Sequence, residues 1–109
     1  MAKALPYRAM TAHGDQLDVV FPLHKETVSP MRVQQLLDAV LNGIDREIGL
    51  LGETANGDVL QALCMATAIR AGIIHAPHGV TADLTRQLLE QALNSLGQAE
   101  RQPAPSGRA

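Results

Sequence analysis

The strongest pattern along the chain is the stretch from Val59 to Ile74, which is apolar on almost every side. Its single formal charge is Arg70. A helix on a protein surface keeps a polar face, whereas a helix that is apolar all round is covered by its neighbours. The pattern therefore predicts that this segment is the buried central helix of the fold.

An amphipathic helix is predicted before this segment, from about residue 30 to residue 51. Ser29 is a good N-cap, and Pro30 suits the first helical position because that position needs no backbone donor. Apolar residues then recur at helical spacing. Gly49 or Gly52 is expected to end the helix, since glycine accepts the left-handed conformation at a helix C-terminus.

Two further helix boundaries follow from polar residues in the connecting segments. Thr54 or Asn56 is expected to cap the central helix. Thr81 is expected to cap a third helix, whose apolar stripe extends to Leu96 and which Gly97 ends. These signals predict three helices in succession.

Residues 16 to 23 show the period of two that is typical of an extended strand. Their apolar side is formed by Leu17, Val19, Phe21 and Leu23. Pro22 cannot donate to a ladder, so we expect an edge strand at most. Three arrangements satisfy the pattern. Residues 5 to 11 can fold back through His13 and Gly14 as a hairpin, the same segment of a second subunit can pair with it, or it can lie along the helices as an extended arm.

The expected fold is mainly α. It is a three-helix bundle-like core around a buried central helix, preceded by a short extended arm or β-hairpin. Residues 1–15 form a leader that can supply the first hairpin strand, and residues 16–97 form a single helical domain. Residues 98–109 hold two prolines and no large apolar side chain, so we predict a disordered tail. Tyr7 and Phe21 are the only aromatic residues, which favours an aliphatic core of packed helices.

Charge and cysteine content exclude several classes of protein. The net charge is −2, and no basic face is left to follow a phosphate backbone. Cys64 is the single cysteine and lies in the apolar segment, so we expect an inert buried thiol and no disulfide framework. The apolar run is shorter than the roughly 20 residues that a membrane span requires. The N-terminus lacks a signal-peptide core, and these features together indicate a cytoplasmic protein.

Two histidines are the candidates for a metal or small-molecule site. His75 and His78 are three residues apart, and they can share a metal only if the loop brings a third ligand. No acidic residue or cysteine is adjacent, so no metal and no cofactor are predicted. The charge of Arg70 is expected to pair with Asp38, Asp45 or Glu47, or to reach water.

A helix-turn-helix is the alternative interpretation of the second and third helices. The third helix carries polar side chains that read bases in such proteins, namely Arg86, Gln87, Gln91, Asn94 and Ser95. However, the connector from His75 to Val80 is longer than the usual turn of about 3–4 residues. The third helix also carries two acids and one cation, so nucleic acid is not the expected partner.

The sequence favours a non-enzymatic protein that acts by protein–protein contact, as a regulator, adaptor or assembly factor. It shows no nucleophile beside a base, no carboxylate cluster and no glycine-rich phosphate loop. Two amphipathic stripes of about 100° each cannot cover a helix that is apolar all round. We therefore predict a homodimer, with contacts expected from Leu17, Val19, Phe21, Leu23 and Arg70. A DNA-binding regulator and a small-molecule or metal-binding protein are the alternative functions.

Overall fold

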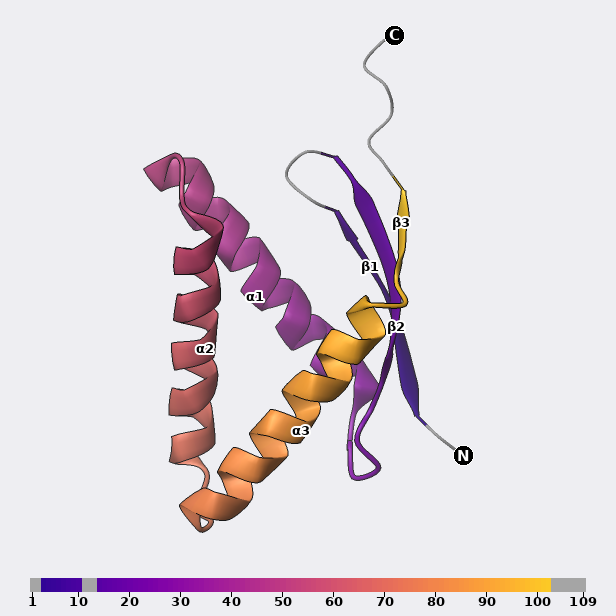
Figure 1. The fold of residues 1–109 in the computed structure, drawn as a ribbon, viewed down its shortest axis with the longest axis vertical. Helices are drawn as coiled ribbons and strands as arrows, with labels where there is room; N and C mark the ends of the chain where they lie inside the picture. Colours follow the sequence, from indigo (N-terminus) through magenta and orange to yellow (C-terminus); the bar gives the residue numbers. More distant parts are fainter. Residues whose placement is uncertain (1–2, 11–13, 103–109) are drawn as a thin grey trace, which may run out of the picture. The chain divides into compact units, whose positions relative to one another are not determined.

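The computed structural model describes residues 3–10 and 14–102 and shows a mixed α/β chain (Figure 1). The order of its elements is β1 (Ala4–Met10), β2 (Gln16–Pro22), α1 (Pro30–Leu51), α2 (Asn56–Ile73), α3 (His78–Leu96) and β3 (Glu100–Gln102). The three strands form one antiparallel sheet in the order β1-β2-β3. The three predicted helices are confirmed, but the expectation of a mainly α fold is corrected by the sheet.

The chain divides into two compact units. The sheet unit comprises residues 1–38 and 90–109, and the helical unit comprises residues 39–89. The sheet unit holds the three strands, the beginning of α1 and the end of α3. The helical unit holds the remainder of α1, all of α2 and most of α3. Each unit is described below by itself.

The first two strands form a β-hairpin. The register runs from Ala4 opposite Pro22 to Met10 opposite Gln16. Gly14, two residues before β2, has a φ of 89°, a conformation that glycine adopts without steric cost. Of the three arrangements that the sequence allowed, the structure shows the hairpin. His13 lies outside the described residues.

The prediction that the second strand lies at a sheet edge is wrong, because β2 is the central strand. The backbone N–H of Leu23 donates to the carbonyl of Lys3 at 2.9 Å. Hydrogen-bonded pairs alternate along an antiparallel ladder. The backbone N–H and C=O groups of the odd-numbered residues of β2 therefore point toward β1, and those of the even-numbered residues point toward the β3 side. The missing donor of Pro22 thus faces the β3 side, where β3 pairs only with residues 16 to 18. A central strand tolerates this proline because the third strand is short.

Part of the predicted disordered tail is ordered. Residues Glu100–Gln102 form β3, with Glu100 opposite Asp18 and Gln102 opposite Gln16. All three residues of β3 are exposed. The strand therefore forms through main-chain pairing with an open sheet edge and not through burial of apolar side chains. Because these residues form no apolar pattern, the sequence gives no signal of a strand here. Residues 103–109 lie outside the described part of the chain.

The apolar core of the sheet unit lies on one face of the hairpin. Leu5 and Val19 are each only 6% exposed. The register places Leu5 opposite Phe21 and Tyr7 opposite Val19, so these four side chains share a face. The Tyr7 hydroxyl bonds to Asp38 on α1. This hydrogen bond joins the face of the hairpin that carries Tyr7 to the beginning of α1.

The predicted limits of α1 are confirmed. Ser29 Oγ accepts a hydrogen bond from the backbone N–H of Arg32 at 3.1 Å, as an N-cap does. Gly52 follows the helix with a φ of 91°.

The predicted caps of the other two helices are wrong. Ala55 is the N-cap of α2 and provides no side-chain cap, while the Thr54 hydroxyl donates to the carbonyl of Gly52. The third helix begins three residues before Thr81, at His78. The Thr81 hydroxyl donates within the helix to the carbonyl of His78 at 3.1 Å. Hydroxyl side chains bond inside helices as well as cap them, so residue type alone did not locate the boundary.

The apolar second helix is not covered by the single chain. None of the residues of α2 is buried. Leu60 is 63% exposed and Ile69 is 64% exposed. The prediction of a buried central helix is therefore wrong for the chain taken alone, and a bundle around α2 is not confirmed. The flanking parts of α1 and α3 leave most of the apolar circumference of α2 open.

Candidate functional site

The histidines do not come together in a metal site. Among residues 3–10 and 14–102, no group of three or more His, Cys, Asp or Glu side chains is placed to hold a metal ion. His75 lies in the connector between α2 and α3, and His78 is the first residue of α3. His24 accepts a hydrogen bond at Nδ1 from the backbone N–H of Glu26 at 3.1 Å. His75 and His78 therefore lack a third described ligand.

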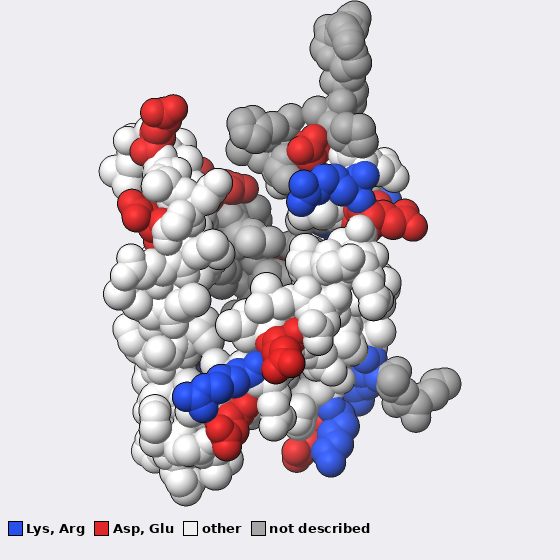
Figure 2. Space-filling model, viewed as in Figure 1, with Lys and Arg blue, Asp and Glu red and all other residues white. Residues whose placement is uncertain are grey.

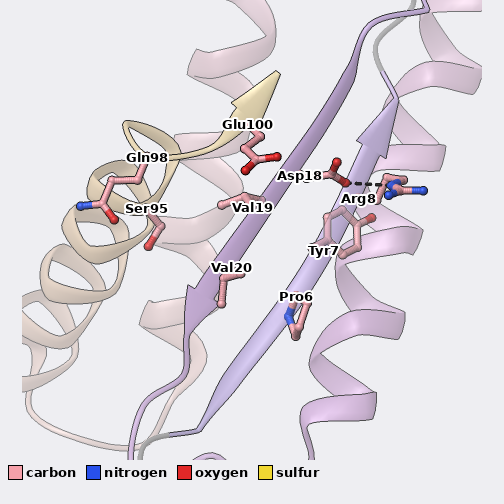
Figure 3. Close-up of a pocket in the computed structure, with 9 residues that line it drawn as sticks. All are labelled: Pro6, Tyr7, Arg8, Asp18, Val19, Val20, Ser95, Gln98 and Glu100. Atoms are coloured by element: carbon pink, nitrogen blue, oxygen red, sulfur yellow. Dashed lines mark hydrogen bonds and ion pairs between the residues drawn. The ribbon is translucent and has the colours of Figure 1, made fainter. Parts of the chain in front are cut away.

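A pocket of about 660 Å³ lies along the sheet (Figure 3). Figure 3 shows its lining from all three strands and the end of α3, namely Pro6, Tyr7, Arg8, Asp18, Val19, Val20, Ser95, Gln98 and Glu100. Arg8 Nε lies 2.7 Å from Asp18 Oδ1, and Glu100 is opposite Asp18 in the strand register. The Arg8 guanidinium, through its hydrogen bond, lowers the pKa of Asp18. The carboxylate is thus held ionised by its own neighbour and is not poised to take up a proton.

A second polar contact joins the sheet to α1. The Tyr7 hydroxyl donates to Asp38 Oδ1 at 2.5 Å, and the contact is part-buried. Burial, reinforced by the hydrogen bond and the negative charge of Asp38, raises the pKa of Tyr7 to about 12. The phenol therefore stays protonated and acts as a fixed donor. This bond anchors the beginning of α1 to the sheet.

An apolar groove of about 560 Å³ lies between α1 and α2 in the helical unit. Its α2 side is formed by Val59, Ala62, Leu63 and Ala66, and Asp58 lies at the beginning of the helix. The α1 side includes Val40, Ile44, Ile48 and Leu51. The groove buries these side chains only in part.

A second groove, of about 470 Å³, lies between α2 and α3. Its α2 side is formed by Thr67, Arg70, Ala71 and Ile74, and the α3 side includes Thr81, Leu84, Thr85, Leu88 and Leu89. The three threonine hydroxyls donate to main-chain carbonyls of their own helices. Their methyl groups therefore leave the groove largely apolar.

The expected partners of Arg70 are not placed beside it. Asp38 is engaged by Tyr7, and Glu47 lines the α1–α2 groove while Arg70 lines the α2–α3 groove. The ion pairs within the described segments join Arg8 to Asp18 and Arg86 to Asp83. The charge of Arg70 is thus left at the rim of an apolar groove.

The third side of α2 borders neither groove. We call it the open face; it consists of Leu60, Gln61, Cys64, Met65, Ala68, Ile69 and Gly72, which helical geometry places on one side. Met65 is 56% exposed and Cys64 is also exposed. The expectation of a buried thiol is therefore wrong for the single chain. Figure 2 shows the surface over α2 without charged side chains along most of its length.

The predicted contact residues of the strand are placed within the chain itself. Val19 is buried in the hairpin, and Leu17, Phe21 and Leu23 are part-buried. Their contact with a second subunit stays a prediction. The apolar pattern of the sequence indicates excess apolar surface on α2, but it does not by itself divide the helix into two lined sides and an open face. The small side chains at Cys64, Ala68 and Gly72 were the available signal.

Comparison with known protein families, with curated proteins and with solved structures finds no match to the chain. Within the described residues, none of the helices combines the length and the apolar character that crossing a membrane requires.

Proposed function

We propose that this chain is a self-associating helical protein of the cytoplasm that acts by protein–protein contact, without catalysis, as a regulator, adaptor or assembly factor. One observation carries the proposal: α2 is apolar on almost every side, and yet none of its residues is buried in the single chain. A soluble protein rarely leaves so large a contiguous apolar surface uncovered, and such surfaces mark sites of association.

The energy at stake is large for a small protein. Leu60, Met65 and Ile69 are each more than half exposed. Fully burying a side chain of this kind contributes about 1.5–3 kcal/mol. Three such side chains therefore represent a sizeable part of the roughly 5–15 kcal/mol by which proteins are stable. Association that covers them also stabilises the fold.

The polar groups of the sheet unit support a structural role over a catalytic one. Arg8 is tied to Asp18, and Tyr7 is tied to Asp38. Polar groups that bond to one another in pairs hold elements in place, whereas catalysis needs a nucleophile, acid or base directed at a substrate.

A DNA-binding regulator is the second proposal, and the length of the α2–α3 connector favours it. The connector comprises residues 74–77, which is shorter than the sequence indicated and within the range of a helix-turn-helix. The electrostatics oppose it, because Arg86 is the only Lys or Arg of α3 and pairs with Asp83 at 3.2 Å. DNA affinity that falls steeply with added salt would favour this second function.

Sedimentation and thermal unfolding test the main proposal together. We expect a species of twice the 11.6 kDa chain mass at micromolar concentration, and a melting temperature that rises with protein concentration. A monodisperse monomer with a cooperative, concentration-independent transition would contradict self-association.

A further inference from the structure

We infer that the groove between α2 and α3 binds a monocarboxylate with an unbranched alkyl chain, of the kind found in medium-chain fatty acids, and that Arg70 holds the carboxylate. The groove lies wholly within the helical unit, and its volume of about 470 Å³ is within the usual range of small-molecule sites. The site needs only α2 and α3 of one chain and is separate from the proposed self-association.

The two grooves beside α2 differ in charge. The charged residues that line the α1–α2 groove are Arg46, Glu47 and Asp58, so negative charge exceeds positive there. Among the described residues that line the α2–α3 groove, Arg70 alone is charged. It takes part in neither of the ion pairs found in the described segments. An anion is therefore attracted to the α2–α3 groove and repelled by the other one.

The guanidinium of Arg70 supplies the hydrogen-bond donors of this groove. The hydroxyl groups of Thr67, Thr81 and Thr85 donate to main-chain carbonyls of their own helices at 2.8, 3.1 and 2.7 Å. A planar guanidinium matches a carboxylate in a bidentate pair. A phosphate dianion would keep an uncompensated charge beside a single cation, and a peptide backbone would gain no hydrogen bond from the threonines. The lining thus suits a ligand with one singly charged, planar head group.

The remainder of the lining suits an alkyl chain. It consists of Ala71, Ile74, Leu84, Leu88 and Leu89. The helical unit contains no Phe, Tyr or Trp, so a flat aromatic ligand finds no ring to stack on. From Thr67 to Ile74 the helix rises by about 10 Å. With C–C bonds of about 1.5 Å, an extended chain of about eight carbons has a similar length. Leu88 and Leu89 are 42% and 52% exposed, so a bound chain removes apolar surface of both partners from water.

Titration of sodium octanoate into the full chain tests the site by calorimetry. We expect 1-octanol, which has the same chain length and no charge, to bind at least about tenfold more weakly, because it lacks the charge-assisted pair with Arg70. Hexanoate should bind about fifteenfold more weakly than octanoate, since each methylene removed from the groove costs about fourfold in affinity.

A matched pair of variants tests the role of the charge. Arg70→Gln should weaken octanoate binding by at least about tenfold and leave octanol binding within about twofold. Arg70 is exposed, so thermal unfolding should confirm that this variant folds as the wild type does. Arg46→Gln removes the same charge from the α1–α2 groove and should leave octanoate binding within about twofold.

Backbone amide shifts in NMR spectra locate the ligand. Octanoate should shift the amides of Ala71 and Thr85, and it should leave those of Ile44 and Val59 in the other groove unchanged. Equal affinity for octanoate and octanol, or octanoate binding that Arg70→Gln leaves intact, would overturn the pairing with Arg70. Shifts confined to Ile44 and Val59 would overturn the location.

A second copy of the chain is the competing occupant of the groove. If the amides of Ala71 and Thr85 responded to protein dilution and not to octanoate, the groove would belong to the contact between chains and the carboxylate site would be wrong. Octanoate binding by a chain that sediments as a monomer would support the carboxylate site and overturn self-association alone.

Discussion

The sheet unit and the helical unit differ in how they stabilise themselves. The sheet unit buries Leu5 and Val19, and its polar side chains meet as the Tyr7–Asp38 and Arg8–Asp18 pairs. Among the described residues of the helical unit, Thr81 alone is buried. The first unit pairs polar groups and buries a small apolar core, whereas the second leaves most of its apolar surface exposed. If the proposed self-association holds, the stability of this protein has two different sources, one within the chain and one between chains.

The largest expected effect is on the helical unit. Leu63 is half-buried on the α1–α2 groove, and Leu63→Asp should destabilise the protein by about 3 kcal/mol or more, because a charge is placed among apolar side chains. Circular dichroism during heating would show loss of the cooperative transition. Gln91→Asp puts the same charge at an exposed position of α3 and should have little effect. Equal behaviour of the two variants would show that the groove contributes nothing to folding.

The sheet unit should respond to a core truncation without any dependence on concentration. Leu5→Ala removes a buried side chain and should cost about 2–4 kcal/mol. We expect the loss in melting temperature to be the same at low and high protein concentration, because this core lies within one chain. Met10→Ala is the matched control, since Met10 lies on the same strand and is 61% exposed. A loss that disappears at high concentration would mean that the sheet core is completed by a second subunit.

The sequence pattern predicted the local structure of the elements better than it predicted which of their surfaces are buried. It located α1 closely and included the hairpin among three possible arrangements, because Ser29, Gly52 and the period of two act through local geometry. It missed β3, whose exposed residues pair through the main chain alone.

Burial was the weakest inference from the sequence. The apolar character of α2 was read as burial within one chain, but hydrophobic periodicity shows only that a surface must be covered. It does not show whether the same chain or another one covers it. The Tyr7–Asp38 contact was also out of reach, because it joins residues 31 positions apart in the sequence.

The Tyr7–Asp38 bond should make the sheet unit sensitive to alkaline pH. The pKa of Tyr7 is raised from 10.0 to about 12, so the folded chain holds this proton more tightly than the unfolded chain does. Its contribution to stability is fully present below pH 10 and is lost as the pH rises through about 12. Tyr7→Phe should cost about 1–2 kcal/mol near neutral pH, since Asp38 loses its donor. The variant should also lose part of the alkaline dependence in denaturant titrations, and an unchanged pH profile would show that this bond is not its source.

The smallest effect that we expect concerns β3. Ending the chain after Gln98 removes the strand and leaves the edge of β2 open at residues 16 to 18. The main-chain bonds lost contribute about 0.5–1.5 kcal/mol each, but the ordering entropy of three exposed residues offsets most of this. We therefore expect a net loss of about 1 kcal/mol in denaturant titration, with the dimer mass unchanged because the helical unit is intact. Arg101→Ala keeps the β3 backbone and should leave stability within about 0.5 kcal/mol. If truncation abolished the dimer while Arg101→Ala did not, the backbone of β3 would be part of the contact between subunits, and the division of roles between the two units would fail.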